Sequence, residues 1–289
     1  MNTVRGALVL LLLSINLVVW GTIVFVCAMF KFVLTGPPRW RLIAFVSRLA
    51  DRWVAANNRI FDALLPTEWD LRIAGDLDRD GHYLIFSNHV SWTDIFVVQR
   101  LLHRRVAFLR FFIKAELIWL PVVGQVAWAL DFPFMRRYTP EYLARHKEKQ
   151  GKDLETTQRA CRRYRRVPAA ILNFLEGTRF SRDKHGEQES PYQYLLRPRI
   201  GGAGFVLVSL GDQLDGVIDV TICYPGHEVT MRDFVTGRVP RIAARARLLD
   251  VPAGFYDPAI VEQGPARERF KGWVEEIWRE KDRVVEALL

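Results

Sequence analysis

The sequence predicts an α/β protein in which a central sheet is flanked by helices and preceded by a helical, membrane-anchoring segment. Two observations predict this architecture. From residue 70 onward, short β-rich runs alternate with helical or polar stretches, which is typical of helices packed over a sheet. Ahead of them lies an uncharged, strongly apolar stretch near the N-terminus. We therefore divide the 289 residues into an anchoring part, 1–66, and an α/β domain, 67–289.

The amino-acid composition limits the classes of protein to which the chain can belong. Half of the residues are apolar, which excludes a disordered chain and favours contact with lipid. The net charge of +9 favours anionic partners such as phosphate, membrane headgroups or nucleic acid. The three cysteines lie far apart and form no C-x-x-C pair, so the sequence offers neither a disulfide framework nor a zinc knuckle, and we expect a reducing compartment.

The stretch from Gly6 to Phe30 predicts an uncleaved transmembrane anchor. Its 25 residues carry no formal charge, and as a helix they would reach about 37 Å, enough for a bilayer core of roughly 30 Å. A secretory signal would have a shorter apolar part and an A-x-A-like cleavage site, which is not seen near Phe30. A buried core helix is less favoured at this length. Only Arg5 lies on the N-terminal side, whereas four basic residues follow, so we expect the α/β domain on the cytoplasmic face, which in a bacterium means the inner membrane. The four basic residues are Lys31, Arg39, Arg41 and Arg48.

Two further segments have the spacing of amphipathic helices. After Pro37-Pro38, apolar residues recur with helical spacing over 40–65, and arginines fall between them. Tryptophan and arginine on such a helix suit the headgroup zone, so the segment fits an interfacial helix beside the anchor, and it fits an ordinary core helix equally well. A similar stripe from Phe270 to Leu288 predicts a helix docked on the domain.

The β-rich runs predict the strands of the domain. They lie at Leu71–Ala74, Tyr83–Ser87, Val106–Leu109, Ala169–Leu175, Val217–Cys223 and Ala244–Leu249. The sequence contains no G-x-S-x-G elbow, Walker loop or G-x-G-x-x-G fingerprint. Hydrolase, NTPase and dinucleotide-binding functions therefore lose their main support.

The first chemically informative stretch is N-H-V-S-W-T-D at 88–94, directly after a predicted strand. On one continuous helix, His89 and Asp94 would point about 140° apart, so they can meet only if His89 lies in a loop and Asp94 in the first helical turn. Ser91 and Asp94 have capping-box spacing, with Ser91 as the N-cap. Taken alone, the pair is explained better by a helix cap and an ordinary loop histidine.

A second stretch, F-L-E-G-T-R at 174–179, also follows a predicted strand. Gly177 permits a sharp turn, Thr178 offers a hydroxyl, and Arg179 presents a fork of N–H donors that matches the oxygens of a phosphate. A surface turn with a salt-bridged arginine is the alternative. Two such loops, each after a strand, favour a functional site.

These two stretches resemble the first and third blocks of the 1-acylglycerol-3-phosphate acyltransferase family, the membrane lysophospholipid acyltransferases. The segment from Lys114 to Arg137 is similar to the family's second block, which ends in a phosphate-binding arginine. We match that arginine to Arg137, with Arg136 as the alternative register. In the fourth block, Asp219 stands where the family usually has proline. R-P-R-I-G-G at 197–202 looks more like the branch that contains lysocardiolipin and lysophosphatidylinositol acyltransferases.

The resemblance implies the glycerolipid acyltransferase fold and acyl transfer from a thioester to the free hydroxyl of a lysophospholipid. The simplest acceptor is 1-acylglycerol-3-phosphate, which would give phosphatidate, and the donor would be acyl-CoA or acyl carrier protein. His89 would act as general base, with Asp94 fixing its tautomer. The residues matched to phosphate binding are Arg137, Glu176, Gly177, Thr178, Arg179 and Arg199, among which Glu176 could instead orient an arginine or shape the loop.

Other interpretations remain beside this one. The acceptor could be another lysophospholipid, of the lysocardiolipin, lysophosphatidylglycerol or lysophosphatidylinositol type, or the chain could be a non-catalytic lipid-binding protein on the same fold. Transfer to lipid A is disfavoured because the lauroyltransferases resemble a histidine with a downstream glutamate, whereas this chain has Asp94. The long anchor and the lack of recognition motifs disfavour a nucleic-acid binder.

No metal and no cofactor beyond the acyl donor is expected, because the other histidines lack ligand spacing. The run 136–166 carries eleven Lys or Arg against four acidic residues. It fits a solvated helix face, and it equally fits a surface that meets anionic lipid, acyl carrier protein or the phosphates of coenzyme A.

Overall fold

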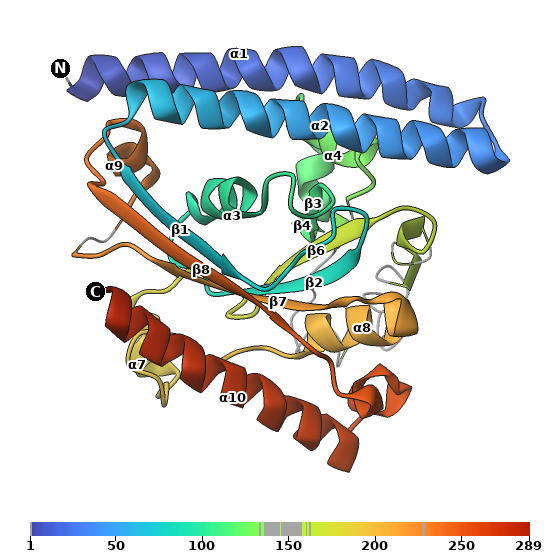
Figure 1. Ribbon diagram of the computed structural model, residues 1–289, viewed down its shortest axis with the longest axis vertical. Helices are drawn as coiled ribbons and strands as arrows, with labels where there is room; N and C mark the ends of the chain where they lie inside the picture. The colour runs from blue at the N-terminus through green and yellow to red at the C-terminus, as the bar shows by residue number, and fades with distance from the viewer. Residues whose placement is uncertain are drawn as a thin grey trace.

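Helices cover both faces of a six-stranded sheet in the computed structural model (Figure 1). The structure describes residues 2–132, 134–135, 145, 158–159, 161, 163–226 and 229–289. The sheet contains β1 (Glu68–Ala74), β2 (His82–Ser87), β3 (Leu109–Phe111), β6 (Ala169–Phe174), β7 (Gly216–Cys223) and β8 (Arg241–Leu249). Two short strands, β4 (Ile113–Lys114) and β5 (Phe134–Met135), form a separate pair. The predicted α/β class with a central sheet is confirmed.

The strand order is β1-β8-β7-β2-β6-β3. Strand β8 runs antiparallel to β7, and the other neighbours are parallel. Ser87 at the end of β2 is in register with Phe174 of β6 and Val220 of β7. The loops that follow these three central strands therefore leave the sheet at the same edge.

The predicted strand at 106–109 is displaced in the structure, because β3 begins only at Leu109. Val106 and Phe108 are buried side chains of the preceding loop. Their apolar run therefore reflects burial and not strand pairing.

The central strands are buried on both faces, which explains why they read as continuous apolar runs. All eight residues of β7 are buried. Among the described residues, the helices that follow the first strand are α3 (Asp94–Leu102), α4 (Val123–Ala129), α7 (Arg182–Glu187), α8 (Gly201–Leu210), α9 (Met231–Val235) and α10 (Pro265–Leu288). The 3-10 turns are η1 (Phe30–Phe32), η2 (Ala115–Trp119), η4 (Gly211–Gln213), η5 (Ala253–Tyr256) and η6 (Pro258–Ile260). Helix α3 packs on one face of the sheet, and α8 and α10 pack on the other (Figure 1).

Two long N-terminal helices, α1 (Asn2–Met29) and α2 (Gly36–Leu64), lie side by side over α3 and α4 (Figure 1). Among the residues that the structure describes, the segment Asn2–Phe32 is the one helical stretch long and apolar enough to cross a membrane. The prolines at 37 and 38 sit in the first turn of α2, where a missing N–H costs no hydrogen bond.

Helix α1 is held against the domain along its length. A Cβ on Gly6 would lie 2.7 Å from the Thr236 side chain in the α9 region, and a Cβ on Gly21 would lie 2.8 Å from Val126 of α4. Past the end of the helix, Lys31 pairs with Asp131 at 2.7 Å. The opposite side of α1 exposes large apolar side chains. Helix α1 therefore has one face packed on protein and one apolar face left open.

Candidate active site

Loops from three neighbouring strands converge at the carboxyl edge of the sheet. His89 follows β2, the segment 176–179 follows β6, and Tyr224 follows β7. Because these strands are parallel neighbours, the loops begin at the same level, and the backbone N–H of Phe180 donates to the His89 carbonyl at 2.7 Å. Ligand sites of open α/β sheets form at this edge.

His89 and Asp94 are in direct contact. The strand ends at Ser87 and α3 begins at Asp94, so His89 lies in the connecting loop and its Nδ1 is 2.8 Å from Asp94 Oδ2. An ionised carboxylate only accepts, so Nδ1 is the donor, and in the neutral tautomer of the imidazole that this contact selects the lone pair is on Nε2. The His89 ring stacks on Phe174 with centroids 4.1 Å apart, and its side chain is 15% exposed. The geometry therefore provides an oriented, reachable imidazole nitrogen.

The Asp94 carboxylate is fully buried and surrounded by donors. The backbone N–H groups of Val90 and Ser91 donate to Oδ2 at 2.6 and 2.9 Å. The hydroxyl of Tyr224 donates to Oδ1 at 2.6 Å. Together with the imidazole N–H, these contacts fix both carboxylate oxygens, and through them the orientation of His89.

Ser91 does not cap the helix as expected. Helix α3 begins at Asp94 and is preceded by Thr93, and the Ser91 hydroxyl accepts from the Thr93 N–H at 3.3 Å. The return contact of a capping box, from the Ser91 N–H to the Asp94 side chain, is present. Ser91 therefore helps to shape the loop two residues before the N-cap position, which Thr93 occupies.

Tyr224 is a site residue that sequence reasoning missed. Burial raises the pKa of its hydroxyl well above the ordinary value, so the group stays protonated. Its single proton goes to Asp94, and the Thr93 hydroxyl, 2.8 Å away, donates to the Tyr224 oxygen. The available signal was its position directly after a predicted central strand, at the same edge as the histidine loop.

Glu176 is buried and connects the histidine loop to the segment around Leu196. Its sequence position predicted a phosphate contact, but the residue is only 1% exposed. Its two oxygens accept from the backbone N–H groups of His89, at 3.2 Å, and Leu196, at 3.3 Å. Burial raises the pKa of Glu176 to about 8. These contacts correct the expected phosphate contact and agree with the alternative role of shaping the loop.

Cationic side chains gather around the turn at Gly177 and Thr178. Gly177 has a φ of +68°, and a Cβ there would lie 3.0 Å from Cδ of Arg199, so glycine lets this arginine lie close to the turn. Lys184, which the motif did not include, donates to the Thr178 hydroxyl at 2.9 Å. The exposed guanidinium of Arg179 lies 4.9 Å from the ring centre of Trp92, beside the histidine loop. Such a group of donors suits a phosphate.

Two expectations from the sequence lie outside the described residues. These are Arg137, with its register alternative Arg136, and most of the basic run 136–166. Within the described ranges, no group of three or more His, Cys, Asp or Glu side chains is placed to hold a metal ion.

Asp219, which stands at the proline position of the fourth block, is buried in β7. Its carboxylate pairs with Lys281 of α10 at 2.6 Å and with Arg247 of β8 at 3.0 Å. Lys281 is itself fully buried. This ion pair joins the central sheet to the C-terminal helix.

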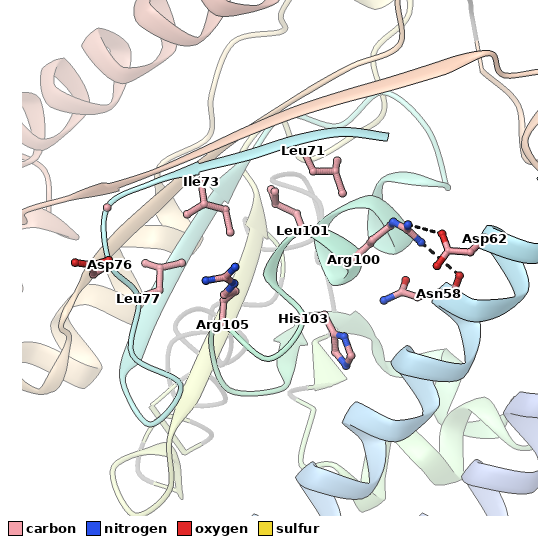
Figure 2. A pocket seen from close by; sticks show the side chains of 11 residues that line it. Asn58, Asp62, Leu71, Ile73, Asp76, Leu77, Arg100, Leu101, His103 and Arg105 are labelled. Carbon is pink, nitrogen blue, oxygen red and sulfur yellow. Dashed lines mark hydrogen bonds and ion pairs between the residues drawn. The ribbon is translucent and has the colours of Figure 1, made fainter. Parts of the chain in front are cut away.

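A cavity of about 640 Å³ is lined by other residues than His89 (Figure 2). It opens between α2, β1 and the C-terminal end of α3, where Arg100 pairs with Asp62 at 2.5 Å. Asp94 stands at the opposite end of α3, a helix of nine residues and hence about 13 Å long. The cavity and the histidine site are therefore separate features.

The matching family model decides what kind of protein this is. The model, described as Acyltransferase, matches residues 70–225, more than half of the chain. The chain belongs to the acyltransferase family. The matched range contains the His89–Asp94 pair and the turn at 176–179, so the resemblance drawn from the motifs is confirmed at the level of the family.

Two curated relatives of this acyltransferase are named as enzymes that acylate lipids. The chain is 26% identical to lysocardiolipin acyltransferase 1 of Danio rerio, over 96% of the chain and 70% of that protein. It is 23% identical to 1-acyl-sn-glycerol-3-phosphate acyltransferase epsilon of Mus musculus, over 73% of the chain and 59% of that protein.

A solved structure agrees with the fold over nearly the whole acyltransferase. It is the crystal structure of the 1-acyl-sn-glycerophosphate acyltransferase PlsC from Thermotoga maritima. The TM-score is 0.57 at 17% identity, and the match covers 99% of this chain and 98% of the other. The chain therefore has the fold of the Thermotoga maritima enzyme over nearly its whole length, and the long N-terminal helix lies within the matched part.

Proposed function

We propose that this acyltransferase moves an acyl group from a thioester donor to the free hydroxyl of 1-acylglycerol-3-phosphate and so makes phosphatidate. One observation carries the proposal. An imidazole oriented by a buried carboxylate lies at the same sheet edge as a turn lined by Arg179, Lys184 and Arg199. A base and a phosphate site side by side are what a phosphorylated alcohol needs in order to react.

The proposed reaction uses His89 as general base. The acceptor hydroxyl attacks the thioester carbonyl, a C–O bond forms, and Nε2 takes the hydroxyl proton. Asp94 keeps the Nδ1 proton in place and balances the imidazolium charge. The tetrahedral intermediate then expels the thiolate, the C–S bond breaks, and the imidazolium returns its proton to the sulfur. The acceptor itself is the nucleophile, so no acyl-enzyme is formed.

The proposed phosphate site combines three basic residues within the described part of the chain and one, Arg137, outside it. Arg179 and Arg199 supply guanidinium donors at the turn, and Lys184 adds an ammonium beside Thr178. Arg137 completes the set by the motif match. These cations hold the headgroup so that the free hydroxyl faces Nε2 of His89.

The proposed donor is acyl-CoA or acyl carrier protein, and the proposed location is the cytoplasmic face of a membrane. Residues 1–66 attach the protein, and residues 67–289 catalyse. The apolar open face of α1 supports attachment, and the basic residues that follow the helix support this orientation.

A second candidate acceptor is another lysophospholipid, of the lysocardiolipin type. The relative with the higher identity of the two named above is a lysocardiolipin acyltransferase, and R-P-R-I-G-G at 197–202 supports the same branch. All of these acceptors carry a phosphate, so the same turn serves each of them.

Purified full-length protein tests the proposal. Lysophosphatidate, lysocardiolipin, lysophosphatidylglycerol, lysophosphatidylinositol and a monoacylglycerol are each offered with palmitoyl-CoA or palmitoyl-acyl carrier protein, and products are identified by mass. We expect lysophosphatidate to react fastest and the unphosphorylated monoacylglycerol to react poorly. No acylated product from any acceptor would identify a lipid binder.

The Arg179→Lys variant separates the phosphate site from general damage in the same assay. It keeps the charge and loses the planar fork, so we expect KM to rise for the phosphorylated acceptors. The rise stays below the roughly 10- to 100-fold that corresponds to losing a charged hydrogen bond, about 1.5–3 kcal/mol. An equal loss with monoacylglycerol would contradict the phosphate role.

A further inference from the structure

An exposed apolar turn lies between β4 and α4. Trp119 is 86% exposed and Leu120 is 48% exposed. We name residues 117–123 the apolar turn, and its exposed large apolar side chains are those of Leu117, Ile118, Trp119, Leu120 and Val123. Val122 within the turn is half-buried. A patch of this kind on a protein surface marks an interaction site.

The backbone of the apolar turn is built to hold this shape. The N–H of Gly124 donates to the Leu120 carbonyl at 2.8 Å. A Cβ on Gly124 would lie only 2.0 Å from the carbonyl oxygen of Ile118, so the helix and the turn approach more closely than any other residue would permit. Val122 has a φ of +67°, which is strained for a β-branched residue. The apolar side chains are therefore displayed by a defined structure.

The apolar turn lies against α1, since a Cβ on Gly21 would be 3.2 Å from Cγ1 of Val122. Helix α4 directly follows the turn and packs on α1, where Trp128 contacts the ring of Phe25 with centroids 6.1 Å apart. Figure 1 shows α1 and α2 lying over α4. The exposed large apolar side chains of α1 include Ile15, Val18, Val19, Ile23, Val26 and Met29. Residues 6–30 contain no charge, so the turn extends an apolar surface that already fits lipid.

The chain leads toward the apolar turn from the same sheet edge as it leads into the histidine loop. The apolar turn comes after β3, and β3 runs parallel to β6, which runs parallel to β2. The carboxyl ends of all three strands therefore point the same way, and β3 is two places from β2 in the sheet. A lipid surface that meets the turn is then on the side of the molecule where His89 lies.

We propose that the apolar turn inserts into the boundary between headgroups and acyl chains of a phospholipid leaflet, beside α1. Lipid is the occupant that fits, because the turn continues the uncharged face of α1 and because tryptophan favours this boundary. Insertion turns the carboxyl edge of the sheet toward the leaflet, so the acceptor reaches His89 without leaving the membrane. This last step rests on the proposed function, whereas insertion itself rests on the surface alone.

Quenching by brominated phosphatidylcholine in phosphatidylcholine–phosphatidylglycerol vesicles tests the insertion. Wild-type protein and the Trp119→Phe variant are compared, and the difference between them isolates the emission of Trp119. We expect this component to be quenched. Trp273→Phe is the matched control, because Trp273 lies on α10, across the sheet from α1 (Figure 1), and the Trp273 component should be unaffected by bromine.

An unquenched Trp119 component in vesicle-bound protein overturns the proposal. Self-association that vesicles do not alter, together with an unquenched Trp119, would show that a second copy covers the turn, and this also overturns it.

A double variant, Trp119→Ser with Leu120→Ser, links insertion to turnover. We expect vesicle affinity and the rate with vesicle-embedded lysophosphatidate to fall about tenfold or more. The kcat with a short-chain, water-soluble lysophosphatidate should stay at the wild-type value. Equal losses with both acceptors would contradict the role of the turn. A wild-type protein that acylates neither acceptor would refute the proposed function, while the quenching result would still decide on insertion.

Discussion

At the scale of single residues, the site depends on how Asp94 is held. Four donors reach its two oxygens: the imidazole of His89, the backbone N–H groups of Val90 and Ser91, and the Tyr224 hydroxyl. Three come from the loop after β2, and Tyr224 comes from the loop after β7. The orientation of the imidazole therefore depends on a contact between chain segments 130 residues apart.

Replacing Tyr224 with phenylalanine tests this positioning role. The variant keeps the ring and removes the donor to Asp94, so His89 is held less well. We expect kcat to fall about 10- to 100-fold, corresponding to a hydrogen bond to a charged group of ~1.5–3 kcal/mol, with KM for both substrates unchanged. Steady-state kinetics at several pH values measure the effect, and the pH profile of kcat should shift.

Tyr83→Phe is the matched control for this experiment. Tyr83 is also buried, and its hydroxyl accepts from the Asp78 N–H at 2.9 Å, away from the histidine loop. It should lower stability without changing kcat. A Tyr224→Phe enzyme with wild-type kcat and pH profile would limit Tyr224 to a structural role.

The sequence predicted those site contacts that are local. His89 and Asp94 are five residues apart, so the strand–loop–helix geometry dictated that they could meet. Tyr224 was missed because its contact with Asp94 spans 130 residues and depends on how the strands pair. Lys184 lies only six residues from Thr178, but it was missed because it stands outside the motif at 174–179. Glu176 was matched to phosphate binding from its place in the motif. Its burial depends on how the loops pack in three dimensions, and the sequence does not show that packing.

At the scale of elements, regular spacing was the reliable signal. The alternating β-rich runs predicted the strands of the sheet, and the stripe from Phe270 to Leu288 predicted α10. The start of α8, at 201–204, gives no helical signal because glycine has a low helix propensity. Helix α8 is stabilised instead by burial against the sheet and α10. Helix α4 was also unpredicted, since its packing on α1 involves distant parts of the chain.

The junction of the apolar turn with α4 gives an element-scale prediction. In Gly124→Ala the new Cβ would lie 2.0 Å from a backbone carbonyl oxygen, which cannot move as a side chain can, so the turn must distort. We expect the free energy of unfolding in detergent to fall by about 1–3 kcal/mol or more. Chemical denaturation followed by circular dichroism measures the change.

Gly272→Ala is the control, since it lies in α10 with no atom near the new Cβ. There, alanine should raise the unfolding free energy by roughly 0.5–1 kcal/mol. If Gly124→Ala stabilised the protein in the same way, the close approach of turn and helix would be wrong.

At the scale of the whole molecule, the long apolar helix α1 packs against the α/β domain. Helix α1 meets the α9 region at Gly6 and α4 at Gly21, so this apolar helix lies along the domain and does not extend from it. The sequence indicated an apolar helix of membrane-spanning length but not this packing, because a stripe of small residues such as Gly6 and Gly21 is hard to distinguish within an apolar helix.

The turnover of the His89→Ala variant tests the central claim most directly. With purified protein, lysophosphatidate and the acyl donor that the wild type uses, we expect kcat to fall by roughly 10²–10⁴ while vesicle binding and the unfolding transition stay unchanged. His82→Ala, at the far end of the same strand, should keep kcat near the wild-type value. Wild-type turnover by His89→Ala would contradict the account, because no general base would then be needed at this position.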